Sequence, residues 1–290
     1  MAEEQLRRQF VSFTFFKVDS AWRRLPEKER EQGKLQFCRV ASEWASSGKM
    51  NVLSYTTVGT RPDTDFMLWR ICYQLEDLQE MTTSLYSTDL GKYLTTPYSY
   101  LAMTKRSTYV IEHQHEGQTD TRGQLRPGKF KYIFVYPFVK TRDWYLLHGE
   151  ARQGLMNEHI RVGTKYQSVK LNTTYSFGLD DQDFVVAFES DKPEDFVDLV
   201  MELRETDSSK YTVRDTPQHT CARKPLEEIS EQDWDRVFAI NTKSVFLCSA
   251  AAARWMMRQK SGVIISIAGA SAHRWRRALP AASRPTGECP

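Results

Sequence analysis

The sequence predicts an α+β fold in which two ferredoxin-like repeats join their sheets into one barrel covered by helices. The first observation is that the segment FFKVDSAW at 15–22 returns as FVKTRDW at 138–144. Further segments recur at a similar spacing: FMLWRICY at 66–73 with FVVAF at 184–188, and LGKY at 90–93 with SSKY at 208–211. Such repetition marks a duplicated unit. Strand-like and helix-like segments alternate within each copy, which is typical of ferredoxin-like modules.

Each copy is predicted to begin with a strand that runs into a helix. In the second copy, the strand at 132–138 is rich in aromatic and β-branched residues and is expected to end at its proline. A helix is predicted over 193–203, because Pro193 and acidic residues occupy its first turn. Its apolar residues share one face, as in an amphipathic helix on a sheet: Phe196, Leu199, Val200 and Leu203.

The composition is that of a globular protein. The chain has 290 residues, of which 40% are hydrophobic and 12% aromatic, so it can bury a core. Its 40 basic and 37 acidic residues are mixed, which does not favour nucleic-acid binding but leaves a small polyanion open. The start of the sequence is charged, and no run approaches the about 18 apolar residues of a membrane span, so we expect a cytoplasmic protein. The five cysteines show no metal or disulfide spacing.

The sequence changes character after Pro225. Residues 226–246 resemble the short-chain dehydrogenase family just before and within its central helix, and 262–267 resemble the strand that follows. The phosphate-binding GxGxxG and the Tyr-x-x-x-Lys pair are missing, and of the catalytic set only Asn241 matches. We therefore expect an incomplete Rossmann-like fragment without redox activity, followed by a disordered tail at 272–290.

Several motifs in order carry a second resemblance. They are YPFVK at 136–140, WYLL at 144–147, LMNEH at 155–159, GLDD at 178–181 and DTP at 215–217. Together they resemble the chlorite dismutase superfamily over residues 8–221, and most closely its coproheme decarboxylase branch. The resemblance implies a dimeric α+β barrel in each subunit, assembly as a homopentamer, and haem in the C-terminal half only.

The resemblance also implies a domain plan. Residues 1–120 are expected to form a repeat without haem, and 121–222 a repeat with the haem site. The dehydrogenase-like fragment then covers 223–271.

A histidine and a tyrosine distinguish the second copy from the first. Aligned on its tryptophan and lysine, the first copy has Phe13 and Phe37 where the second has Tyr136 and His159. Taken alone, His159 is better explained as a helix-surface residue, and Tyr136 as a core residue at a strand end. The resemblance implies that His159 is the proximal iron ligand and Tyr136 the radical residue. A carboxylate such as Glu158 is expected to orient the far nitrogen of His159.

The remaining site residues are expected to bind propionates or line the distal side. By resemblance, Lys140 is a proton donor or propionate partner, and Arg122 and Ser209 contact propionates. Chlorite dismutases place an arginine at a fixed count after the proximal histidine. In this sequence the residue at that position is Asn172. An uncharged side chain there argues against efficient chlorite chemistry. A weaker candidate is the segment EHQHE at 112–116, whose two histidines could bind a divalent metal.

The predicted function is that of a haem-dependent oxidoreductase of haem (porphyrin) biosynthesis. Such an enzyme uses hydrogen peroxide to convert iron coproporphyrin III (coproheme) into haem b by oxidative decarboxylation of two propionates. The alternatives are a haem-binding peroxidase or weak chlorite-decomposing enzyme of the same fold, and a non-catalytic haem carrier. Transient contact with a ferrochelatase is the protein partnership expected, with no nucleic acid and no membrane.

Overall fold

The computed structural model describes residues 7–107, 109, 123–225, 244–259 and 261. The chain divides into two compact units, Met1–Trp234 and Asp235–Pro290. Three of the candidates from the sequence lie outside the described residues: Arg122, the histidine pair within 112–116, and Asn241.

The first unit contains two similar successions of elements. The first is β1 (Phe10–Val18), η1 (Ser20–Arg24), α1 (Glu27–Ser46), β2 (Met50–Thr56), β3 (Phe66–Cys72), α2 (Leu75–Tyr86), η2 (Gly91–Tyr93) and β4 (Leu94–Met103). The second is β5 (Tyr132–Lys140), α3 (Arg142–Leu146), α4 (Gly149–Gly163), β6 (Val169–Tyr175), β7 (Phe184–Ser190), α5 (Pro193–Glu205), η4 (Asp207–Tyr211), β8 (Thr212–Arg214) and β9 (His219–Arg223). The second unit contains the helix α7 (Ser244–Gln259).

The nine strands described in the first unit belong to one antiparallel sheet, so the predicted α+β class is confirmed. Their order is β7-β6-β4-β1-β3-β2-β9-β5-β8, and β7 also pairs with β5. Within the first succession the order is therefore β4-β1-β3-β2, and within the second β9-β5-β7-β6. Each succession thus places its strands in the same relative order, as a duplicated ferredoxin-like unit requires.

Equivalent contacts at the end of the first strand also relate the two halves. They are Asp19 N to Tyr93 O (2.8 Å) with Thr141 N to Tyr211 O (2.8 Å), and Val18 N to Asp65 Oδ2 (2.8 Å) with Lys140 N to Asp183 Oδ2 (2.8 Å). By these bonds, Lys140 of the second half is structurally equivalent to Val18 of the first half and not to Lys17. Tyr136 therefore corresponds to Thr14 and not to Phe13, because the two lysines of the repeated segment lie one residue out of step.

Strand β5 also continues further than the sequence predicts. It was expected to end at Pro137, but Pro137 pairs with Val185 of β7 and the strand runs on to Lys140. On its other side, β5 pairs with β9 up to Val135 and with β8 from Val139. The proline thus lies where β5 has a partner on only one side, which is where a strand tolerates a missing amide hydrogen.

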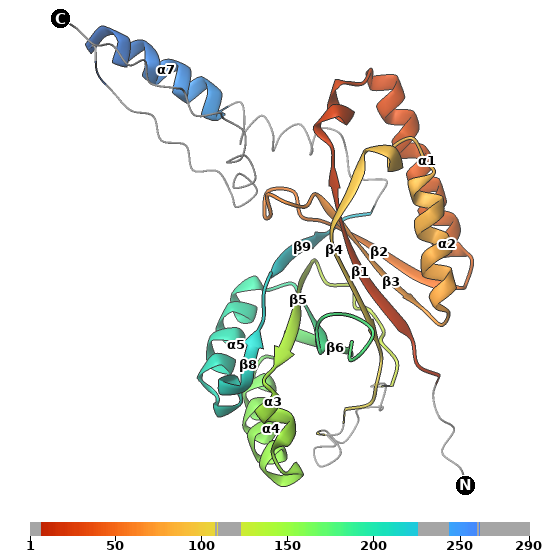
Figure 1. Cartoon of the computed structure of the whole chain (residues 1–290), viewed down its shortest axis with the longest axis vertical. Helices are drawn as coiled ribbons and strands as arrows, with labels where there is room; N and C mark the ends of the chain where they lie inside the picture. The colour runs from red at the N-terminus through yellow and green to blue at the C-terminus, as the bar shows by residue number, and fades with distance from the viewer. Residues whose placement is uncertain (1–6, 108, 110–122, 226–243, 260, 262–290) are drawn as a thin grey trace, which may run out of the picture. The chain divides into compact units, whose positions relative to one another are not determined.

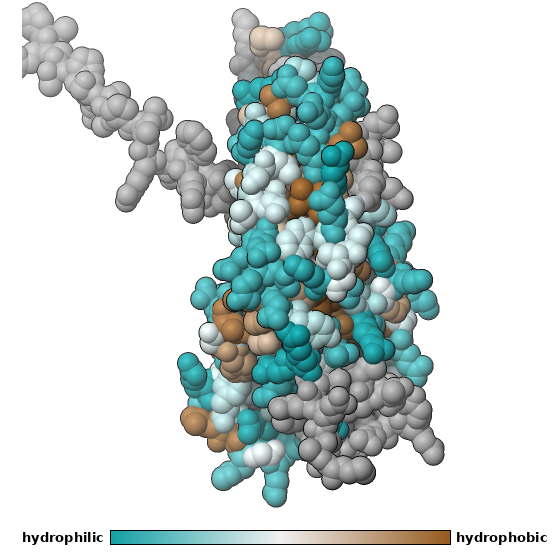
Figure 2. Space-filling view, turned by 90° about the vertical axis from the view of Figure 1, so that its right-hand side faces the viewer, coloured by the Kyte–Doolittle hydropathy of each residue, from teal (hydrophilic) through white to brown (hydrophobic). Residues whose placement is uncertain are grey.

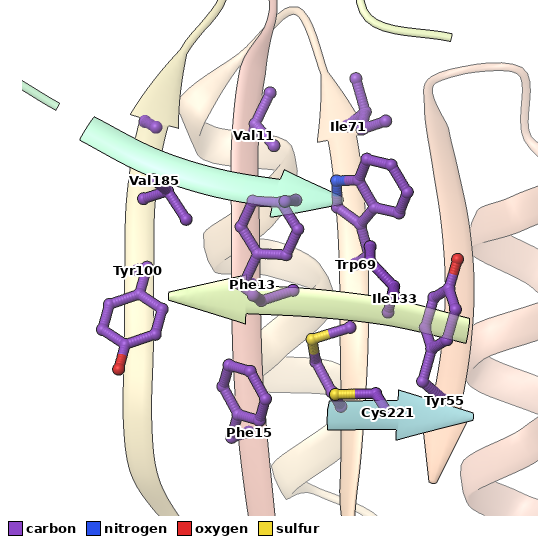
Figure 3. Close-up of a cluster of buried hydrophobic side chains, with 14 of the residues drawn as sticks. Val11, Phe13, Phe15, Tyr55, Trp69, Ile71, Tyr100, Ile133, Val185 and Cys221 are labelled. Carbon is purple, nitrogen blue, oxygen red and sulfur yellow. The ribbon is translucent and has the colours of Figure 1, made fainter. Parts of the chain in front are cut away.

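The two faces of the sheet bury different cores. One face carries a cluster to which both halves contribute, including Phe13, Trp69, Ile133 and Val185 (Figure 3). On the other face, α1 and α2 lie on the strands of the first half, whereas α3, α4 and α5 gather around β5, β6 and β8 (Figure 1). Because side chains alternate along a strand, β5 directs Ile133 and Val135 to the shared core and Phe134 and Tyr136 to the helices.

None of the helices among the described residues is both long enough and apolar enough to span a lipid bilayer.

Candidate functional site

Three of the side chains predicted for the site lie on the helix-covered face of the second half. Strand β5 carries Tyr136 and Lys140, an even number of residues apart, and α4 carries His159. Downstream of β5, Thr141 caps α3, because its side chain accepts a hydrogen bond from Trp144 N at 3.2 Å. This cap fixes the turn from β5 into α3 and places the Trp144 ring next to Lys140.

His159 is a half-buried, neutral imidazole. Its Nδ1 lies 3.3 Å from Ser208 Oγ of η4. Burial is the main cause, and the positive charge of Lys140 a second one, that lowers the pKa of His159 to about 4, whereas Glu158 acts in the opposite direction. At neutral pH the ring is therefore uncharged, which is the form that binds a metal ion.

The expected carboxylate partner of His159 is engaged elsewhere. Glu158 Oε2 accepts a hydrogen bond from Asp207 N at 3.1 Å, so it ties α4 to η4 instead of orienting the imidazole. Ser208 occupies that place, a role that the sequence did not predict. Ser209, which was predicted as a propionate contact, donates its backbone N–H to Thr206 O at 3.0 Å. The repeated segment held a signal, because SSKY places Ser208 where LGKY has the buried Leu90.

Lys140 brings an ammonium group to the same residue. Its Nζ donates to Ser208 O at 2.7 Å and lies 4.5 Å from the Trp144 ring centre and 5.3 Å from that of Phe138. Burial lowers the pKa of Lys140 to about 8. Among the described residues, no carboxylate forms an ion pair with it. The site therefore holds a cation that lacks a counterion from the described part of the chain.

Tyr136 is buried on the same face and stays protonated. Its ring stacks on that of Phe188, with centres 6.1 Å apart. Burial raises the pKa of Tyr136 well above its usual value; the carboxylate of Asp215 raises it further, and the guanidinium of Arg204 opposes this effect. At neutral pH this side chain is therefore a phenol and not a phenolate.

Asn172 lies on the other face of the sheet. It pairs with Ala187, which belongs to the shared core, and its Nδ2 donates to the fully buried Glu189 at 2.9 Å. Its neighbours Leu171 and Thr173 point to the helix-covered face instead. The structure does not bring Asn172 together with His159, because a residue count that crosses a loop does not determine which face a strand residue takes.

These residues fit a ligand that supplies most of its own metal coordination. No group of three His, Cys, Asp or Glu side chains that could hold a bare metal ion occurs in the described part of the chain. An iron porphyrin needs a single imidazole from the protein, apolar surface for the ring and cations for its propionates. His159 and Lys140 supply the imidazole and the cation.

The second half, which contains these groups, also carries large apolar side chains that water still reaches. They include Leu146 (80% exposed), Leu171 (52%), Phe177 (50%) and Leu179 (42%). In Figure 2, which shows one face of the molecule, apolar residues gather in the lower part, at the level of α3, α4 and α5 in Figure 1. The donor set and the exposed apolar side chains of this half thus fit an iron porphyrin.

Comparison with known proteins agrees with this chemistry. The family model for chlorite dismutase matches residues 30–224, and the one for short chain dehydrogenase matches 220–281. A coproheme decarboxylase from Mycolicibacterium smegmatis is 33% identical over 176 residues, which are 60% of this chain and 74% of that protein.

Solved structures match most of the chain. A mutant chlorite dismutase from Candidatus Nitrospira defluvii is 31% identical with a TM-score of 0.71, covering 78% of this chain and 95% of that one. A haem-binding protein from Thermus thermophilus, 24% identical with a TM-score of 0.68 over 77% and 94% of the two chains, shares the fold.

Proposed function

The chain belongs to the chlorite dismutase family of haem-dependent enzymes, and we propose that it is a coproheme decarboxylase. In the proposed reaction, each of two propionates of iron coproporphyrin III reacts with one hydrogen peroxide. The propionate becomes a vinyl group, and one carbon dioxide and two water molecules leave. Haem b is the product.

The observation that carries this proposal is the pairing of His159 and Lys140 at one residue, Ser208. The Ser208 hydroxyl is bonded to a neutral imidazole, and the Ser208 carbonyl to an ammonium group without a counterion among the described residues. This pair suits a bound molecule that contains a metal ion and also carries carboxylates. Coproheme carries four such groups and haem b two. The more highly charged porphyrin therefore gains more from this site.

Each side chain has a distinct role in the proposal. When bound, the iron porphyrin supplies the centre at which peroxide reacts. His159 holds the iron, and Lys140 binds a propionate and can supply a proton. Tyr136 gives up its phenolic hydrogen atom to the oxidant that peroxide provides and takes one in turn from the propionate side chain. The same peroxide accepts the second electron as the carboxyl group leaves as carbon dioxide and the vinyl group forms. Arg122 and Ser209 are retained as propionate contacts on the resemblance alone.

The proposal extends to the architecture. The pairing of β7 with β5 leaves each of β1–β7 and β9 paired along both of its edges, which supports closure of the sheet into a barrel. The homopentamer, the transient contact with a ferrochelatase and the cytoplasmic location rest on the family resemblance.

Product analysis tests the proposal. Purified protein is titrated with iron coproporphyrin III, peroxide is added stepwise, and the porphyrins are identified by mass spectrometry. The wild type should lose two carboxyl groups in succession through a three-propionate intermediate. Tyr136→Phe should bind coproheme but stop at the substrate. Tyr132→Phe changes a tyrosine on the same face of β5 and should behave as the wild type.

If coproheme binds and is only bleached by peroxide, the decarboxylase assignment is wrong. A haem peroxidase or a haem carrier then accounts for the site. Retention of product formation in Tyr136→Phe would contradict the role of that residue alone.

A further inference from the structure

A chain of hydrogen bonds leads away from the candidate iron ligand. His159 Nδ1 lies 3.3 Å from Ser208 Oγ, and Ser208 Oγ lies 3.0 Å from Thr206 Oγ1. Thr206 Oγ1 then donates to the backbone carbonyl of Leu203 at 2.7 Å. Ser208 and Thr206 are only 2% and 4% exposed, so water does not compete for these hydroxyls.

The direction of this chain is fixed from its far end. A carbonyl can only accept, so the single proton of the Thr206 hydroxyl is committed to Leu203 O. Thr206 can then only accept from Ser208, which commits the Ser208 proton in turn. Ser208 Oγ is left with a lone pair facing His159, so Nδ1 of the imidazole must carry the hydrogen.

We propose that Ser208 and Thr206 are positioning residues that hold His159 in its Nδ1–H tautomer and leave Nε2 as a bare electron pair. The tautomer follows from the hydroxyl chain itself; that the bare nitrogen binds porphyrin iron rests on the proposed function. The backbone carbonyl of Ser208 also accepts a hydrogen bond from Lys140 Nζ at 2.7 Å. One residue thereby sets the ring orientation of the ligand and the position of the propionate-binding cation.

The hydrogen-bond chain also sets how strongly His159 donates electrons to a metal. It ends on a neutral carbonyl, and the nearest carboxylate in sequence, Glu158, is engaged at Asp207 N. A carboxylate acceptor at Nδ1 would pull the proton and make Nε2 a stronger donor to a metal. His159 is therefore a neutral electron-pair donor to a metal. Replacement of Ser208 by an acidic residue should make His159 a stronger donor.

Nitrogen-15 NMR of the ligand-free protein tests the tautomer directly. With labelled histidine at neutral pH, the long-range proton–nitrogen spectrum of the wild type should show Nδ1 protonated and Nε2 unprotonated at His159. Thr206→Val removes the acceptor that orients the chain, and Ser208→Ala removes the partner; both should give a mixture of tautomers. Thr206→Ser keeps the hydroxyl and should retain the wild-type spectrum.

An Nε2–H tautomer in the wild type would overturn the proposal, whether or not any variant folds. Unchanged tautomers in folded Thr206→Val and Ser208→Ala would do the same. Because no porphyrin is present, the result is independent of the decarboxylase assignment.

The iron-loaded protein gives a second readout. Ser208→Asp should lower the iron reduction potential relative to the wild type, whereas Ser208→Thr should leave it unchanged. A potential that does not move in Ser208→Asp, with coproheme still bound, would contradict the coupling of Ser208 to the ligand.

Discussion

At the scale of single residues, Lys140 has the least usual environment. A half-buried ammonium group with one carbonyl partner and two aromatic faces has lost much of its hydration. This loss is the physical cause of its lowered pKa. A bound carboxylate would compensate for it, so the charge should contribute to ligand affinity rather than to folding.

Lys140→Met is expected to separate these two contributions. It should leave the free energy of unfolding of the ligand-free protein within about 1 kcal/mol of the wild type, because methionine keeps the apolar stem. Coproheme affinity, measured by absorbance titration, should fall roughly 10-fold to 100-fold, as loss of a charge-assisted hydrogen bond implies.

Lys17→Met is a control from the first half, where the lysine of the repeated segment pairs with Asp65 at 2.9 Å. It should leave coproheme affinity unchanged. Equal affinity losses in the two variants would contradict a specific role for Lys140.

His219 of β9 predicts how stability depends on pH. It is 1% exposed, stacks on Phe15 with ring centres 4.0 Å apart, and its Nε2 lies 3.3 Å from the Tyr100 hydroxyl. Burial lowers the pKa of His219 to about 4 from its usual 6.5. Between these values the unfolded chain binds the proton and the folded chain does not. Stability therefore falls as the pH drops from 6.5 towards 4.

The expected contribution of His219 is a loss of about 2 kcal/mol in the free energy of unfolding between pH 7 and pH 5. Urea unfolding of wild type and His219→Gln at both pH values measures it. The loss should be smaller by about that amount in the variant, with the remainder due in part to His159, whose pKa is also lowered. The same pH dependence in both proteins would rule out His219 as a cause.

At the scale of elements, the turn after β5 is held by Asp183. Its Oδ2 accepts from Lys140 N at 2.8 Å and from the Tyr145 hydroxyl at 2.8 Å. Asp183→Ala should destabilise the fold by about 2–3 kcal/mol, because it leaves an amide and a phenol without their acceptor. Chemical denaturation checks this value. An effect below about 0.5 kcal/mol would show that water replaces the carboxylate.

Elements with a regular apolar pattern were predictable from sequence. The helix expected at 193–203 is α5, Pro193–Glu205, with Phe196 and Leu199 buried on the predicted face. Its period, its N-terminal proline and its acidic first turn all favour the same structure. The strands of the repeated segments were likewise predictable from their apolar residues.

Features that depend on register or on distant contacts were not predictable. The face of β6 on which Asn172 lies follows from its pairing with β7, and the continuation of β5 through Pro137 follows from pairing on one side. Ser208 was missed because its importance arises only when η4 meets α4. The family resemblance selected Tyr136, Lys140 and His159 for the site, and tertiary contacts decided their partners.

At the scale of the whole molecule, duplication explains why one half carries the site. In the first half, Phe37 takes the place of His159 and fills it, with its ring edge-on to Phe16 and Phe66 at 6.4 Å and 5.8 Å. Leu90 likewise stands where the second half has Ser208. In the first half, these positions carry apolar side chains that pack in the core, so we expect one porphyrin per chain.

The dehydrogenase-like segment should be dispensable for this chemistry. A chain ending at residue 225 keeps every described residue of the proposed site. It should bind coproheme with unchanged stoichiometry, and its melting temperature should stay within about 2 °C of the full chain. Calorimetry and absorbance titration measure both quantities. Loss of binding on truncation would show that the segment contributes to the site or to assembly.

Iron ligation by His159 is the claim on which the rest depends, and resonance Raman spectroscopy of the reduced coproheme complex tests it most directly. The account predicts one porphyrin per chain and an iron–histidine stretching band in the wild type. The band should persist in His148→Ala, which changes an exposed histidine at the start of the same helix, and disappear in His159→Ala. An iron–histidine band that survives in His159→Ala would contradict the account.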